Sequence, residues 1–216
     1  MQMGKLYGNN DMVKIDCHDC KGCSSCCRDM GQSIWLDPYD IYQMTIQLKK
    51  TFEELLSQEI ELHVEEGLIL PNIRMVGEGE PKCSFLNAAG RCEIHAVRPG
   101  FCRLFPLGRN YESGKLTYFI LDDACPAPLK SKIKINKWLS VPRIKEYEAF
   151  LIEWHGLTKK LRETYAANID NEAIIKAINM QFLQIFYIAP YNEEDFYLQF
   201  AERFEKMRTF LQTIGI

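Results

Sequence analysis

Residues 17–27 read CHDCKGCSSCC, and this stretch places five of the chain's nine cysteines within eleven residues. The spacing is Cys-x2-Cys-x2-Cys-x2-Cys-Cys, and it ends on the adjacent pair Cys26 and Cys27. Core packing does not require this density, because alanine or valine would fill a similar volume. Thiolates are soft metal ligands, and a Cys-x2-Cys spacing lets one turn of backbone wrap an ion or a cluster. The stretch therefore predicts a cysteine-ligated metal site in a polar loop.

Two ligand registers are open within this run. Cys17, Cys20, Cys23 and Cys27 reproduce the C-x2-C-x2-C-x3-C run of bacterial ferredoxins, although Arg28 stands where those proteins have proline. Alternatively, the ligands are Cys20, Cys23, Cys26 and Cys27, and Cys17 is spare. His18 is a further candidate ligand, but we favour an exposed loop histidine.

The other four cysteines are far apart in the sequence, at Cys83, Cys92, Cys102 and Cys125. Such wide gaps indicate that any site built from them is assembled by tertiary folding rather than by one loop. Two sites of four thiolates would use eight cysteines and leave one over. Whether the two groups form one site or two stays open.

Ligand type alone does not choose between zinc and an iron–sulfur cluster, since both accept four thiolates. A zinc ribbon pairs two Cys-x2-Cys knuckles, and the downstream group has none. We therefore favour one or two iron–sulfur clusters, with [4Fe–4S] as the preferred type, and keep a structural zinc module that mediates protein interaction as the alternative. A third hypothesis is a thiol redox sensor that uses the Cys26–Cys27 pair. Disulfides are disfavoured, because the cysteine count is odd and no signal peptide is visible.

Composition places the chain among globular proteins, with 47% hydrophobic and 25% charged residues over a length of 216. We expect a cytoplasmic protein without a membrane span, because the longest apolar run is too short to cross a bilayer. The net charge of −3 argues against a broad nucleic-acid footprint. Nucleotide-binding, zincin and serine-hydrolase motifs are absent from the sequence. The sequence does not indicate an oligomeric state.

Capping signals and apolar periodicity predict the helices. Asp37-Pro38 and the Thr51–Glu54 capping box should each open a helix, the second of which runs to about His63 and stops at Gly67. After residue 130 three longer helices are expected, with starts near Ile144, at Asn171 and at Asn192. The expected strands are residues 68–76, interrupted by Pro71, and residues 116–121.

These patterns predict a mainly α fold with a loop-rich, cysteine-ligated metal core, little β structure and a C-terminal helical bundle. The expected organisation is a cysteine-cluster domain over residues 1–130, followed by a helical extension over residues 131–216.

Several ordered motifs resemble the CxxCxxCC cysteine-cluster (YkgJ-like) family, which is described as a zinc- or iron-chelating domain and includes flagellin lysine-N-methylases. The motifs are CKGCSSCC at 20–27, IWLDPYDI at 34–41, CSFL at 83–86, GRCEIHAVRP at 90–99, CRLFP at 102–106 and CP at 125–126. The resemblance covers about residues 15–130, and Cys17 falls outside its core motif. It implies metal ligation by Cys20, Cys23, Cys26, Cys27, Cys83, Cys92, Cys102 and Cys125. It also implies a protein lysine-methylation role beside the redox role, with a protein substrate or a redox partner.

Arginines surround Cys102 at Arg98, Arg103 and Arg109. A thiolate site is anionic, and guanidinium groups would offset its charge or clamp a carboxylate or phosphate, so we consider these three as cofactor-binding residues. Ion pairing with Glu93 or with Asp122 and Asp123 is the alternative, and the two roles are compatible. His95 is expected to have a packing or hydrogen-bonding role.

Overall fold

The computed structural model describes residues 4–17, 23–126 and 130–216, so Cys20 and His18 lie outside the described residues. The chain divides into two compact units, and each unit combines two separate segments of the sequence. Unit 1 comprises Met1–Gly31 and Met75–His155, and unit 2 comprises Gln32–Arg74 and Gly156–Ile216. The sequence-based division into 1–130 and 131–216 is a single cut, whereas these units interleave along the chain. Within the described residues, no helix has both the length and the apolar character needed to cross a membrane.

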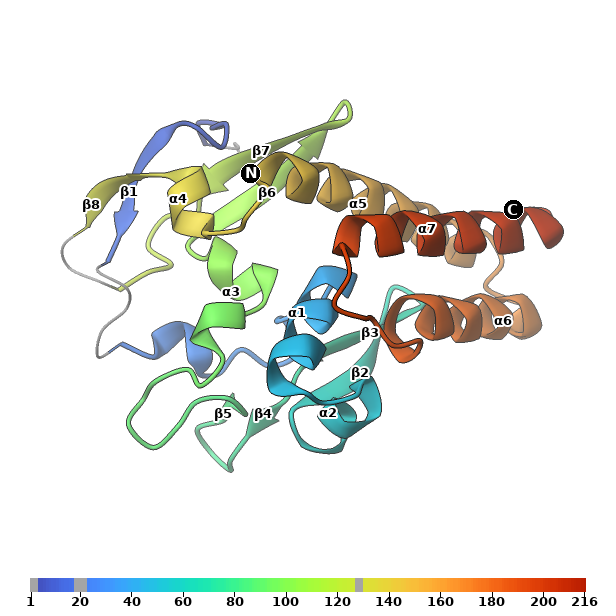
Figure 1. Cartoon of the computed structure of the whole chain (residues 1–216), viewed down its shortest axis with the longest axis horizontal. Coiled ribbons are helices and arrows are strands. Elements are labelled where there is room, and N and C mark those ends of the chain that lie inside the picture. Colours follow the sequence, from blue (N-terminus) through green and yellow to red (C-terminus); the bar gives the residue numbers. More distant parts are fainter. Residues whose placement is uncertain (1–3, 18–22, 127–129) are drawn as a thin grey trace. The chain divides into compact units, whose positions relative to one another are not determined.

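Unit 1 is built from short strands and short helices that irregular segments connect (Figure 1). In chain order its elements are β1 (Met12–Asp16), η2 (Ser25–Cys27), β4 (Met75–Val76), β5 (Lys82–Cys83), η3 (His95–Val97), α3 (Gly100–Leu104), β6 (Leu107–Glu112), β7 (Lys115–Ile120), β8 (Ser131–Lys134), α4 (Ile135–Leu139) and the first half of α5 (Ile144–Ala167).

The strands of unit 1 pair as three antiparallel ribbons: β1 with β8, β4 with β5, and β6 with β7. Tyr118 on β7 is fully buried. Its backbone pairs with that of Tyr7 near the start of the chain, and its hydroxyl donates to Glu148 Oε1 at 2.8 Å. Asn9 donates to the other oxygen of Glu148 at 2.7 Å. Burial and the neighbouring carboxylate raise the pKa of Tyr118, so the phenol remains a neutral donor in this network.

Unit 2 contains helices and one hairpin. Its elements are α1 (Pro38–Leu48), α2 (Phe52–Gln58), β2 (Ile60–Glu65), β3 (Leu68–Ile73), the second half of α5, α6 (Glu172–Leu183), the π-helical turn η4 (Gln184–Ile188) and α7 (Phe196–Thr213).

The predicted helix starts in unit 2 are confirmed at three of four positions. Asp37 and Thr51 each form a complete capping box, and the Asn171 side chain accepts from the amide of Ile174. The helix α7 begins three residues later than predicted, because Asp195 caps it. Asn192 instead accepts from the amide of Glu194 in the preceding turn.

The hairpin β2–β3 replaces the second half of a predicted helix. The helix α2 ends at Gln58, and β2 pairs with β3 from Ile60 opposite Ile73 to Glu65 opposite Leu68. The two turn residues, Glu66 and Gly67, have φ angles of 49° and 85°, as a two-residue hairpin turn requires. A Cβ at Gly67 would also lie 2.9 Å from the Tyr165 ring, so glycine is needed for space as well as for conformation.

Aromatic rings from α6, η4 and α7 fill much of the core of unit 2. Phe182, Phe186, Phe196 and Phe200 are each at most 3% exposed, and neighbouring rings lie 5.4–6.0 Å apart. Arg203 on α7 closes this core, because its guanidinium donates to the carbonyls of Ile185, Ala189 and Pro190 at the end of η4. The aromatic side chains of these helices therefore form helix-packing faces.

The predicted fold class was wrong in its β content. The structure has 45% helix and 20% strand, with four two-stranded sheets among the described residues, so it is a mixed α and β fold. The predicted helical C-terminal part is present as α5, α6 and α7. Most of the missed strands are short or lie beside turns, where the alternation of apolar residues is too brief to identify a strand.

Candidate metal centre

The cysteine loop at the start of unit 1 is bonded to the strand that carries Cys83. The residues Ser25–Cys27 form a single 3-10 turn, which is closed by the amide of Cys27 on the Ser24 carbonyl at 2.9 Å. Just after this turn, Asp29 donates its amide to the Pro81 carbonyl at 2.9 Å, and Arg28 pairs with Lys82. The loop is thus held next to β5, across a gap of more than fifty residues in the sequence.

A tight reversal brings Cys92 back to Cys83. The amide of Leu86 donates to the Cys83 carbonyl at 2.9 Å, and Leu86 then pairs with Cys92. Between them, the Asn87 side chain accepts from the amides of Ala89 and Arg91, both at 3.0 Å. An asparagine that bonds its own downstream amides makes such a turn without help from the rest of the fold.

Backbone amides point at the sulfur atoms of both cysteines in this reversal. The amide two residues on, from Phe85 for Cys83 and from Ile94 for Cys92, bonds the sulfur and lowers its pKa. Burial acts in the other direction and is stronger, so the pKa of Cys83 rises to about 11 and that of Cys92 also rises. Amides aimed at sulfur stabilise a thiolate, whereas burial without a cation disfavours one. These two positions therefore suit a thiolate that a bound cation compensates.

Cys26 joins the two segments electrostatically. Its side chain is hydrogen-bonded to Cys27, and this bond together with burial raises the pKa of Cys26 far above its ordinary value. A charge on Cys26 also raises the pKa of Cys83 and of Cys92. Like charges at this range oppose one another, so several thiolates coexist here only when a positive charge compensates them. Thiolates prefer a soft cation as this compensating charge.

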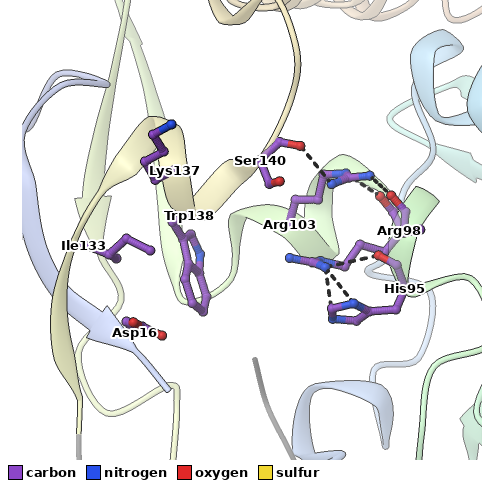
Figure 2. A pocket seen from close by; sticks show the side chains of 9 residues that line it. Asp16, His95, Arg98, Arg103, Ile133, Lys137, Trp138 and Ser140 are labelled. Carbon is purple, nitrogen blue, oxygen red and sulfur yellow. Dashed lines mark hydrogen bonds between the residues drawn. The ribbon is translucent and has the colours of Figure 1, made fainter. Parts of the chain in front are cut away.

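Arg98 is the cationic side chain that changes the pKa of these thiols. Its guanidinium lowers the pKa of both Cys26 and Cys92. Its Nη1 atom also lies 3.0–3.1 Å from the ring nitrogens of His95 and donates to the His95 carbonyl at 3.1 Å (Figure 2). The predicted hydrogen-bonding role of His95 is therefore confirmed.

The other two predicted arginines are bonded elsewhere. Arg103, which is 9% exposed, donates to the carbonyls of Ala96, Arg98, Leu139 and Ser140 and braces the backbone (Figure 2). Arg109 on β6 donates to the Tyr147 hydroxyl at 3.0 Å. A cofactor-binding role for Arg103 and Arg109 stays a prediction.

For the remaining predicted ligands the structure gives mainly their exposure. Cys23 is exposed and lies 3.5 Å from the Ser25 hydroxyl. Cys102 on α3 and Cys125 are half-buried, as is Cys17 on the other side of the loop. Among the residues that the structure describes, no group of three or more His, Cys, Asp or Glu side chains is arranged to hold a metal ion. The full ligand set therefore stays a prediction, and Cys20 lies outside the described residues.

The structure places none of the six cysteines Cys23, Cys26, Cys27, Cys83, Cys92 and Cys125 in a disulfide. Cysteines on two bonded segments, with backbone amides aimed at two of the sulfur atoms, are the features of a cysteine-cluster protein. Residues 19–126 match the model of the CxxCxxCC family, a putative zinc- or iron-chelating domain, and the chain belongs to this family. No curated protein and no solved structure matches the chain.

Proposed function

We propose that this chain chelates an iron–sulfur cluster through cysteine thiolates and that the cluster serves a redox reaction. The observation that carries the proposal is that the loop of Cys26 and Cys27 is bonded to the strand that carries Cys83, and that a charge on Cys26 acts on both Cys83 and Cys92. Membership of a zinc- or iron-chelating family supports chelation itself. When bound, an iron–sulfur cluster would supply a site that accepts and releases single electrons.

The protein's own part in this function is to collect thiols and to control their charge. The bonds of the loop to Pro81 and Lys82 bring the adjacent cysteines to β5, and the Asn87 turn returns Cys92 to the same place. The Arg98 guanidinium and the amides of Phe85 and Ile94 reduce the cost of negative charge on sulfur. Hydrogen bonds to sulfur and nearby cations are also among the features that set a cluster's reduction potential.

The same proposal places the protein in a reducing compartment such as the cytoplasm, where clustered thiols persist. A protein redox partner would accept the electron. Protein lysine methylation, which the family resemblance implies, is the further reaction that we carry forward as a prediction.

Metal analysis of the protein distinguishes the iron–sulfur proposal from the zinc alternative. We expect protein purified without oxygen to be brown, to absorb broadly in the visible region, and to contain iron and acid-labile sulfide in equal amounts. Mass spectrometry under native conditions should show the intact chain with an added mass that matches the measured iron and sulfide. A colourless protein with stoichiometric zinc and no sulfide would replace the iron–sulfur proposal with the structural zinc module.

A further inference from the structure

The strand β2 is the outer strand of the β2–β3 hairpin in unit 2 (Figure 1). In an antiparallel pair, residues that bond the partner strand alternate with residues whose amide and carbonyl point away from it. The two-residue turn closes on a bonded pair at Glu65, so the pairs at Val64 and Leu62 are of the second kind. Leu62 and Val64 therefore direct their amides and carbonyls away from β3.

The outward groups of β3 agree with this alternation, because other parts of unit 2 bond them. The Ile69 amide donates to the Asn179 side chain at 2.8 Å. The Pro71 carbonyl and the Ile73 amide bond the backbone of residues 34–36 at 2.9 and 3.0 Å. The outer edge of β3 is therefore covered within the unit.

The outward groups of β2 are not covered in this way. Among the residues that the structure describes, none bonds the outward amide or carbonyl of Leu62 or Val64. The side chains of these two residues are also 38% and 67% exposed. The Ile60 carbonyl, by contrast, accepts from the Arg74 guanidinium at 3.1 Å, so the open part of the edge begins at Leu62. Proteins often protect such an edge with lysine, proline or a bulge, and β2 has none of the three.

The charge of β2 indicates which kind of strand fits this edge. Glu61 and Glu65 lie on the face opposite to Leu62 and Val64. Glu65 is exposed and makes no ion pair with a residue that the structure describes. A second copy of β2 that used the whole open edge would place its Glu65 opposite Glu61, and like charges directly opposite one another are destabilising. A strand with cationic side chains at these positions replaces repulsion by attraction.

We propose that β2 receives an extended segment of a partner protein in which apolar residues alternate with lysine or arginine. The segment pairs antiparallel with β2, so that the outward amides and carbonyls of Leu62 and Val64 gain partners. Its apolar side chains lie beside these two residues, and its cationic side chains lie beside Glu61 and Glu65. Backbone bonds supply the affinity, and the alternation of side chains supplies the specificity. The docking strand uses no residue of the candidate metal centre.

The probe for the test is the peptide acetyl-KVKVKVK-amide, and acetyl-EVEVEVE-amide is its acidic counterpart. Binding is followed on the full chain, labelled with nitrogen-15, by the NMR shifts of its backbone amides. We expect the basic peptide to shift the amides of Leu62 and Val64 saturably, with a Kd on the order of 1 mM at low salt. The acidic peptide should bind at least about 10-fold more weakly.

Methylation of the peptide backbone tests the strand pairing itself. In the proposed pairing the valine amides of the peptide face β2, and its lysine amides face away. Methylation of the valine amides should therefore abolish the shifts, because the bonds to β2 are lost. Methylation of the lysine amides should leave the affinity within about 2-fold of the unmodified peptide.

Variants of the chain test the two contributions separately. Glu65→Lys should weaken binding of the basic peptide about 5-fold, whereas Glu202→Lys, which makes the same change of charge at an exposed position on α7, should leave it unchanged. Val64→Pro removes one outward amide and should also weaken binding about 5-fold, whereas Val64→Thr keeps the amide and should bind normally. Proline is compatible with a strand position whose amide faces solvent.

Four results would overturn the proposal. They are the absence of saturable shifts at Leu62 and Val64, equal affinity for the acidic peptide, equal effects of the two kinds of methylation, and equal effects of Glu65→Lys and Glu202→Lys. A chain that dimerises through residues 60–65 without peptide would assign the edge to a second copy and would also overturn it. The peptide comparisons use the unaltered chain, so they decide the question even if a variant fails to fold.

Discussion

Replacing Cys92 by serine is expected to reduce the bound metal to less than about a tenth of the wild-type amount, because a soft thiolate donor is replaced by a hydroxyl that stays protonated. The sulfur of Cys92 accepts the Ile94 amide, lies under the influence of Arg98, and interacts with Cys26 across the two segments. Serine is close to cysteine in size, so the fold should persist while the soft donor is removed. Metal per chain, measured by inductively coupled plasma mass spectrometry, is the readout.

Cys17→Ser is the matched control for this prediction. Cys17 precedes the family's core motif and is half-buried like Cys92, so its replacement should leave the metal content within about 20% of wild type if it is the spare cysteine. If Cys17→Ser loses its metal as Cys92→Ser does, the ferredoxin-like register that uses Cys17 is correct and the register with the adjacent pair is not. If Cys92→Ser keeps its metal, the downstream segment does not contribute ligands.

Replacing Arg103 by methionine is expected to lower the free energy of unfolding by about 3 kcal/mol, because the buried guanidinium is lost and its carbonyl partners stay behind without a donor. Arg103 joins the segment from Ala96 to Arg98 to the end of α4 at Leu139 and Ser140. Four carbonyl oxygens lose a charged donor in the variant, and methionine fills only part of the space. In urea unfolding followed by circular dichroism, the midpoint should fall by about 1–2 M.

Arg91→Met is the control for the arginine prediction. Arg91 is exposed in the turn between Cys83 and Cys92, so the free energy of unfolding should change by less than about 0.5 kcal/mol. Equal stability of Arg103→Met and Arg91→Met would contradict the bracing role. A destabilised Arg103→Met with a normal metal content would show that the brace supports the fold without controlling the thiols.

Local signals in the sequence were sufficient for most helix starts. Asp37 before Pro38 and the Thr51–Glu54 pair act within one turn of backbone, so no distant contact was needed to predict them. The strand β3 lies within the expected strand 68–76, but its partner β2 was missed because the helix pattern of α2 was extended to about His63. The alternation of Ile60, Leu62 and Val64 before Glu66-Gly67 is the signal that could have revealed it.

The sequence pointed to the cysteines of the candidate metal centre but not to the way in which the fold groups them. Cysteine spacing drew attention to the N-terminal loop and to the downstream segment. The match of residues 19–126 confirms the predicted family. The approach of Cys26 to Cys83 and Cys92 depends on backbone bonds of Asp29 to Pro81 and of Arg28 to Lys82, which no spacing rule encodes.

X-ray absorption spectroscopy at the iron and zinc edges of the purified protein tests the central claim, metal held by cysteine thiolates, most directly. At the edge of the bound metal we expect a first shell of sulfur at about 2.3 Å, and at the iron edge also the iron–iron scattering of a cluster. A first shell made only of oxygen or nitrogen, or a chain that holds neither iron nor zinc in stoichiometric amount, would contradict the claim.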